Sequence, residues 1–181
     1  MDGKSVKKPV LFLFLLAVLL WAAGRAFGAS PYFDFNIQSH HLIVHIDPSE
    51  RLLKAEDRLE INMKRGRVYT LSFLLHPHLK ITRVVDQRTG QPLDWSEVNF
   101  SAHARRWDIS LHKVEESPLL SISYEGPIYD PVAKEKELQF VRGDVTSGLI
   151  SPEGVFLSNA THWYPDRPGS MSTFQIEATI P

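Results

Sequence analysis

Apolar and polar residues alternate over short stretches of this chain, and turn-forming residues separate the stretches. The alternation covers residues 41–46, 69–75, 107–112 and 120–125, with turn signals such as Gly126-Pro127 between them. A period of two residues places successive side chains on opposite faces of a β-strand. Several short strands at this spacing predict an all-β domain, an antiparallel β-sandwich or saddle of two packed sheets.

Residues 50–63 fit two different patterns. Leu52, Ala55, Leu59 and Met63 would form the apolar stripe of a helix. Every second residue from Leu53 to Met63 would also form the apolar face of a strand, with Asp57 as the only exception. We prefer the strand because residues 41–46 need a hairpin partner.

The C-terminal part of the chain contains two further candidate strands. Residues 148–168 combine glycines, prolines and large aromatic residues around a short apolar run, Val155 to Leu157, which predicts a brief buried strand between two stiffened loops. Further on, the apolar residues of 174–180 alternate with polar ones. This second pattern predicts a half-buried strand.

The N-terminus has the pattern of a targeting segment. Lys4, Lys7 and Lys8 precede an apolar run over residues 9–23, and small residues follow it. The run is shorter than the about 20 residues of a membrane-spanning helix. We therefore expect residues 1–29 to form an N-terminal signal helix of a cleaved signal peptide, with a membrane anchor through residues 9–23 as the alternative. The domain over residues 30–181 would then be exported, and either periplasmic or extracellular, or anchored to a membrane outside the cytoplasm.

Charge and cysteine content narrow the class of protein further. The 181 residues carry a formal net charge of −1 and include no cysteine. A near-neutral chain lacks the electrostatic footprint of a nucleic-acid-binding protein, so we expect no nucleic acid partner. Without cysteine the exported domain has no disulfide and must be stable from its core alone.

Three segments together resemble a known family. The Gly154-Val-Phe-Leu157 run, the Trp163-Tyr-Pro165 loop and a last strand that closes on Pro181 resemble the end of the N-terminal β domain of the membrane alanyl aminopeptidase (aminopeptidase N) family of zinc metallopeptidases. Residues 41–61 resemble the opening hairpin of that domain, and residues 121–127 a later strand with its exit turn. The resemblance covers roughly residues 38 to 181 and implies a saddle-like N-terminal domain over residues 30–181.

The chemistry of that family is not encoded in this sequence. Its zinc site needs a His-Glu-x-x-His motif, in which two imidazoles bind one zinc ion and the carboxylate acts as general base. Neither this motif nor the family's Gly-x-Met-Glu-Asn segment occurs in the chain. We therefore expect a non-catalytic domain without cofactor or metal, with zinc only in a catalytic domain that the chain does not contain.

The resemblance also implies a partner and an interface. In the resembled family a catalytic peptidase domain would begin just after Ile180-Pro181, where this chain stops. We therefore expect a truncated or split chain. Its partner would be the catalytic peptidase domain, in cis or in trans. Since the end of the β domain lies closest to the junction, the residues expected at the domain interface are Phe156, Trp163, Tyr164 and Pro165.

Two other functions compete with this interpretation. A free-standing exported β-sandwich that binds a ligand or partner in the bacterial envelope would need no catalytic domain. Eight histidines invite a metal site, yet pairs such as His76 and His78 match no closed ligand motif and no cysteine supports them. Ser158, His162 and Asp166 lie on one short stretch, but no nucleophile elbow surrounds the serine.

Overall fold

The computed structural model describes residues 35–63, 69–113, 117–130, 133–134 and 144–181. The predicted signal segment, residues 1–29, lies outside this part of the chain. No helix within the described ranges is long and apolar enough to cross a membrane.

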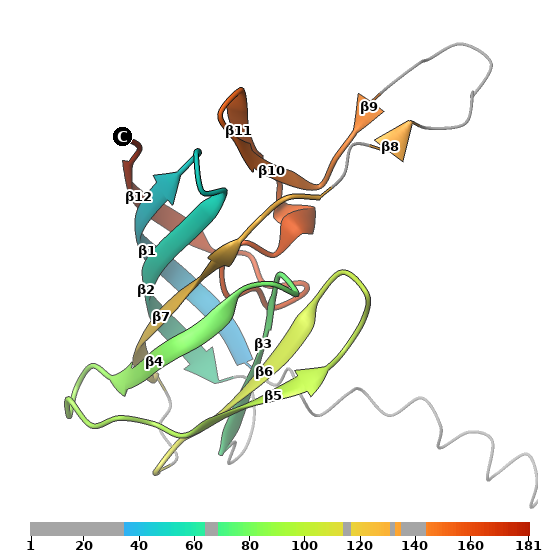
Figure 1. Ribbon diagram of the computed structural model, residues 1–181. Coiled ribbons are helices and arrows are strands. Elements are labelled where there is room, and N and C mark those ends of the chain that lie inside the picture. Colours follow the sequence, from blue (N-terminus) through green and yellow to red (C-terminus); the bar gives the residue numbers. More distant parts are fainter. Residues whose placement is uncertain (1–34, 64–68, 114–116, 131–132, 135–143) are drawn as a thin grey trace, which may run out of the picture. The chain divides into compact units, whose positions relative to one another are not determined.

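A five-stranded sheet is the largest element of the fold (Figure 1). Its strands lie in the order β12 (Thr173–Thr179), β1 (Phe35–Asp47), β2 (Leu52–Met63), β7 (Leu119–Pro127) and β4 (Lys80–Asp86). β1 and β2 form a long antiparallel hairpin closed at residues 48–51. One face of this sheet, here called the inner face, carries buried residues such as Leu42, Leu59 and Ile122.

A three-stranded sheet contributes the rest of the core. It consists of β3 (Thr70–Leu75), β6 (Arg105–Ser110) and β5 (Trp95–Asn99), in that order. Phe35 of the large sheet and Phe73 of the small one meet edge to face, with ring centroids 5.3 Å apart. Because both side chains are fully buried, this contact joins the two sheets into one hydrophobic core.

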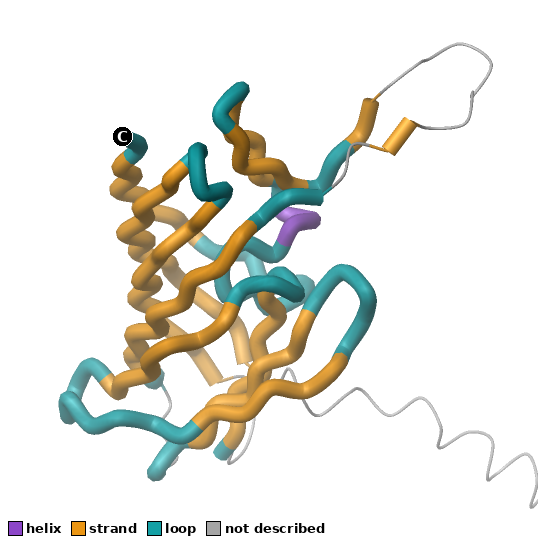
Figure 2. Tube along the Cα trace, in the orientation of Figure 1, coloured by secondary structure: helices purple, strands orange, loops and turns teal. Residues whose placement is uncertain are grey.

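Two short hairpins complete the described strands. β10 (Gly148–Ser151) pairs with β11 (Gly154–Leu157), and β8 (Ala133–Lys134) pairs with β9 (Asp144–Val145). A single 3₁₀ turn at Asn159–Thr161 follows β11 and is the short purple segment in Figure 2. The main-chain N–H of Ile150 donates to the carbonyl of Ile128, which ties the β10–β11 hairpin to the segment after β7.

The prediction of an all-β fold is confirmed, and so is the strand over residues 52–63. The prediction of two packed antiparallel sheets holds only in part. β12 runs parallel to β1, and the described strands form one large sheet, one small sheet and two hairpins. A long connection separates β1 from β12, and such a connection permits a parallel return that a tight hairpin does not.

The predicted burial of the last two strands is also wrong. β12 forms where the alternation placed it, but every residue from Thr173 to Thr179 is exposed. β11 likewise forms, with Gly154, Val155 and Phe156 exposed and Leu157 half-buried. The apolar run of β11 and the alternation of β12 identified the two strands, whereas the described chain leaves most of their apolar residues exposed.

Candidate interaction surface

An aromatic cluster links the loop after β11 to the outer end of the large sheet. The ring of Tyr164 lies 5.1 Å from that of Trp163 and 5.2 Å from that of Phe174, centroid to centroid, with both pairs edge to face. The Tyr164 hydroxyl donates to the side-chain carbonyl of Asn159. Since Trp163 and Tyr164 also pack against the hydrophobic core, the cluster fixes the loop on β12.

Beneath this cluster lies a buried pair of polar side chains, His40 and Asp57. The His40 Nδ1 and the Asp57 Oδ2 are 2.7 Å apart, and both side chains are almost completely buried. The His40 ring stacks flat on Phe174, with centroids 4.6 Å apart and planes 1° from parallel. Burial raises the pKa of Asp57, and the hydrogen bond to His40 acts against this effect. The pair therefore joins β1, β2 and β12 through one polar contact and one stacked ring.

Asp57 has a second oxygen that stays unpaired. Its Oδ1 and the Tyr124 hydroxyl are both buried without a hydrogen-bond partner among the described residues. Burial raises the pKa of Tyr124 well above its ordinary value, and the nearby Asp57 adds to this effect, so the phenol stays neutral.

A pocket of about 330 Å³ opens beside the aromatic cluster. It is lined by Ile37, His40, Asn159, Tyr164, Asp166, Phe174 and the turn over residues 168–172. Aromatic rings and a carboxylate both line the pocket, which gives it a mixed character. A small ligand or a single side chain of a partner fits such a volume.

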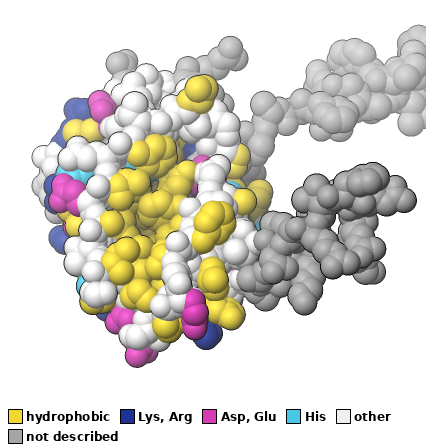
Figure 3. Space-filling model, turned by 90° about the horizontal axis from the view of Figure 1, so that it is seen from above, with side chains coloured by type: hydrophobic (Ala, Val, Ile, Leu, Met, Phe, Trp, Pro, Cys, Tyr) yellow, Lys and Arg dark blue, Asp and Glu magenta, His cyan; other side chains and the backbone are white. Residues whose placement is uncertain are grey.

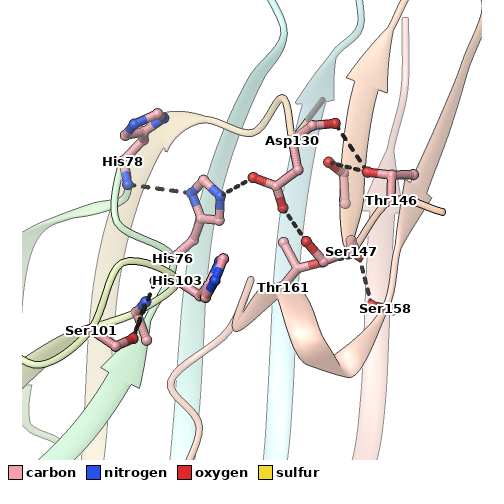
Figure 4. A network of polar contacts seen from close by, with 11 residues as sticks. His76, His78, Ser101, His103, Asp130, Thr146, Ser147, Ser158 and Thr161 are labelled. Carbon is pink, nitrogen blue, oxygen red and sulfur yellow. Dashed lines mark hydrogen bonds and ion pairs between the residues drawn. The ribbon is translucent and has the colours of Figure 1, made fainter. Parts of the chain in front are cut away.

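A second polar network holds the base of the β10–β11 hairpin (Figure 4). The main-chain N–H of His78 donates to Nδ1 of His76, at 3.3 Å, so Nε2 of His76 carries the hydrogen and donates to Oδ1 of Asp130, at 3.1 Å. The Ser147 hydroxyl donates to the other carboxylate oxygen of Asp130. Burial lowers the pKa of His76, and for Asp130 the hydrogen bonds from Ser147 and His76 outweigh burial and lower the pKa.

A serine triad of Ser158, His162 and Asp166 does not assemble. His162 Nδ1 and Asp166 Oδ2 do approach to 2.9 Å. The Ser158 hydroxyl, however, donates to the main-chain carbonyl of Ser147, at 2.6 Å, as Figure 4 shows. The order Ser–Asp–His in the Ser147 network is equally unsuited to nucleophilic catalysis, because the histidine must lie between the serine and the carboxylate.

Hydrophobic side chains gather on the face that Figure 3 presents, seen from above Figure 1. In Figure 1 the C-terminal end of β12, the β1–β2 turn and the tip of the β10–β11 hairpin reach toward that side. The exposed large apolar residues of β11 and β12 are Val155, Phe156, Phe174 and Ile176. Exposed apolar residues on soluble proteins mark interaction sites when they gather, so the exposed apolar residues of β11 and β12 are the candidate functional site.

The four residues predicted at a domain interface lie at different depths. Phe156, which pairs with Leu149 near the base of the β10–β11 hairpin, is 53% exposed. Trp163 and Tyr164 are half-buried, and Pro165 is buried. The sequence did not single out His40 or Phe174 as part of the same surface. The only local sign was that Asp57 interrupts the apolar alternation of its strand.

Several histidines of the described chain contact separate carboxylates. His41 contacts Glu177 across β1 and β12, with Nε2 and Oε1 2.9 Å apart, while His76 binds Asp130. Within the described ranges, no three His, Cys, Asp or Glu side chains are grouped so that they could hold a metal ion.

Comparison with solved structures identifies the fold. No protein-family model and no curated protein matches the sequence. The chain is similar to the M1 zinc metallopeptidase from Deinococcus radiodurans, with a TM-score of 0.54 at 16% identity, over 82% of this chain and 33% of that one. It is also similar to native leukotriene A4 hydrolase from Saccharomyces cerevisiae, with a TM-score of 0.58 at 12% identity, over 92% of this chain and 27% of that one.

At these identities the likeness is one of fold, and it extends over a third of the metallopeptidase chain or less. The matched region is all-β and includes most of this chain. The chain therefore has the fold of one part of the M1 zinc metallopeptidases, and the resemblance to the N-terminal β domain of that family is confirmed.

Proposed function

We propose that the chain is a non-catalytic β domain of an exported, aminopeptidase-like zinc metallopeptidase, and that it supports and partly covers a catalytic domain supplied in cis or in trans. The observation that carries the proposal is the open apolar face of β11 and β12 on a fold that matches only part of much longer peptidases. A strand with an exposed apolar face indicates that another surface covers it.

The aromatic loop supports the same assignment. Trp163 and Tyr164 are fixed by contacts to each other and to Phe174, so their exposed edges present a rigid surface. Rigid aromatic anchors are characteristic of the central residues of protein interfaces, because they bury much area at little cost in conformational entropy. Phe156, which is exposed on β11, would be buried by the same partner.

The sequence contributes the rest of the proposal. Without a His-Glu-x-x-His motif the zinc ion would belong to the catalytic domain, and the chain itself would bind none. The basic and apolar pattern of residues 1–29 supports export, with the domain in the periplasm or outside the cell, or attached to a membrane.

One observation favours a different function. The pocket beside His40, Tyr164 and Phe174 has a volume of about 330 Å³, which suits a small ligand. In that case the chain would be a free-standing binding module of the envelope, and no peptidase would be needed.

Capture of the chain from the cells that produce it distinguishes the two functions. The affinity-tagged full chain should bring down an activity that hydrolyses alanine p-nitroanilide, that a zinc chelator abolishes and that added zinc restores. Phe156→Asp should lower the captured activity at least about tenfold, which corresponds to about 1.4 kcal/mol of binding free energy. Phe100→Asp is the matched control, because Phe100 has nearly the same exposure, 51% against 53%.

Three results would contradict the proposal. Capture of no chelator-sensitive activity would favour the binding module. Equal losses in the two variants would show that the β11 surface is not the interface. Activity in the full chain purified from a host without the partner would refute the non-catalytic role.

A further inference from the structure

β12 is the outermost strand of the large sheet. It pairs in parallel with β1 on one side, from Ser39 opposite Thr173 to His45 opposite Thr179, and its other edge has no partner among the described residues. An unpaired edge offers a row of N–H and C=O groups to another strand. Native proteins usually protect such edges with charges, prolines or bulges, and β12 carries only one charged residue, Glu177.

The two faces of β12 differ in chemistry. Phe174, Ile176 and Ala178 lie in register with His40, Leu42 and Val44 of β1, so they belong to the inner face. The β1 residues are buried, whereas Phe174 is 45% and Ile176 50% exposed. The opposite face carries Gln175, Glu177 and Thr179. The apolar inner face thus continues to the edge of the sheet and is uncovered there.

We propose that β12 pairs antiparallel with β12 of a second copy of this chain. The two-fold axis of this pair passes between Ile176 of one copy and Ile176 of the other. The axis joins the two five-stranded sheets into one continuous sheet. Each residue of the strand then lies opposite the residue equally far from Ile176 in the second copy, so all seven residues from Thr173 to Thr179 are paired. Such an isologous contact closes on itself and ends in a dimer.

Side-chain chemistry selects this register. Gln175 lies opposite Glu177 of the second copy, so each carboxylate faces an amide donor. Phe174 lies opposite Ala178, which places a large side chain against a small one. Each Glu177 also keeps its contact with His41 of its own chain, with Nε2 and Oε1 2.9 Å apart. Opposite residues of an antiparallel pair point to the same face, so the apolar inner faces of the two copies become continuous.

Neighbouring registers are less favourable. An axis through Glu177 would place two carboxylates directly opposite each other, which destabilises a strand pair. An axis through Gln175 would place Ala178 and Thr179 opposite Ser172 and Met171, which lie outside the strand. An axis between two residues would put the apolar face of one copy beside the polar face of the other.

This proposal shares the exposed inner face of β12 with the proposed function but can fail separately from it, because its test concerns the pairing edge of β12 and uses neither the β10–β11 hairpin nor a peptidase. The absence of cysteine in the chain permits a direct test of the register. Directly opposite Cβ atoms of an antiparallel pair are about 4.5–5.5 Å apart, close to the Cβ distance of a disulfide, while diagonal neighbours are about 7–8 Å apart.

The test uses single-cysteine variants of the full chain, kept dispersed in a mild detergent and oxidised briefly. Ile176→Cys should form a covalent dimer. Gln175→Cys and Glu177→Cys should each stay largely monomeric alone and should cross-link to each other when mixed, because residue 175 faces residue 177 of the second copy. Phe100→Cys, exposed and outside β12, is the control for random collisions.

Several results would overturn the proposal. Ile176→Cys without a covalent dimer would leave the edge of β12 to a different partner. Equal cross-linking of Ile176→Cys and Phe100→Cys would indicate random contact. Glu177→Cys that cross-links alone as well as Ile176→Cys would place the axis elsewhere and refute this register.

Discussion

Asp57 occupies a core position of β2, with Ala55 and Leu59 as its neighbours on the same face. A carboxylate at such a position is tolerated only when it is hydrogen-bonded, and His40 supplies the bond at 2.7 Å. The pair lies beneath Phe174, so it also supports β12, in which every residue is exposed. A contact between residues on two strands thus sets the local packing of a third.

The first prediction concerns this pair. Asp57→Ala should lower the free energy of unfolding by about 1–3 kcal/mol, because His40 Nδ1 is left buried without a partner. Asp57→Asn should lower the free energy of unfolding clearly less, because the amide oxygen can still accept a hydrogen bond from the His40 imidazole. Urea unfolding of the two variants and the parent chain at neutral pH measures the difference. Equal losses in both variants would show that the hydrogen bond does not matter.

The second prediction concerns His76 and pH. Burial lowers its pKa below the ordinary value of 6.5, so the unfolded chain binds this proton more readily than the folded chain. The contribution of His76 to stability is therefore complete above pH 6.5 and is lost as the pH falls through the lowered pKa of the folded state. His76→Gln keeps a donor for Asp130 without this titration.

Unfolding experiments at acidic pH test the direction in which His76 changes the stability. The parent chain should lose more stability than His76→Gln as the pH is lowered below 6.5. His45→Gln, at an exposed position of β1, should follow the parent chain. If His76→Gln and the parent chain have parallel pH profiles, the histidine does not titrate as its burial implies.

At the scale of elements, the path of β7 depends on a close approach between two main-chain segments. Gly126, near the end of β7, lies against the main chain of the turn after β3. A Cβ atom at Gly126 would lie 2.1 Å from the carbonyl oxygen of His78, whereas a Cβ at Gly154, in the β10–β11 hairpin, would meet nothing within 4 Å. Only glycine allows β7 to pass this close to residues 78 and 79.

The third prediction compares these two glycines. Gly126→Ala should lower the free energy of unfolding by at least about 1–3 kcal/mol, because main-chain atoms must move to admit the methyl group. Gly154→Ala should be neutral or stabilise by up to about 1 kcal/mol, because alanine restricts the unfolded chain. Thermal and urea unfolding of both variants provide the comparison. A Gly126→Ala chain as stable as Gly154→Ala would rule out the close approach.

Most strands that were predictable from sequence have a nearly complete alternation, and β4 and β5, which lack one, were not predicted. β1, β2, β3, β6 and β7 fall on the alternating stretches. β4 was not predicted, because a register shift between Ile81 and Arg83 puts its buried residues, Ile81 and Val84, three positions apart. β5 was not predicted, because it has no buried residue and its sequence therefore shows no apolar face. The pairing of His40 with Asp57 depends on strand register, which no local pattern specifies.

At the scale of the whole molecule, the inner face of the large sheet is covered unevenly. Leu42 and Ile176 are neighbours on adjacent strands, yet Leu42 is 0% and Ile176 50% exposed. The alternation of residues 174–180 specifies which side chains share a face, but it contains no information on what packs over that face. Sequence therefore predicted β12 as a strand and failed to predict its exposure.

The last prediction measures where the core of the isolated chain ends. Leu42→Ala should lower the free energy of unfolding by about 2–5 kcal/mol, the range for truncating a large buried aliphatic side chain. Ile176→Ala, one strand away in the same row, should change it by no more than about 0.5 kcal/mol at protein concentrations low enough to keep the chain monomeric, because its side chain is already half in water. At higher concentration the Ile176→Ala chain should unfold at a lower denaturant concentration than the parent chain, since stability gained by association depends on the concentration of the partner. A loss of several kcal/mol for Ile176→Ala in the monomer would mean that β12 is packed into the core, and the open inner face on which both proposals draw would not exist.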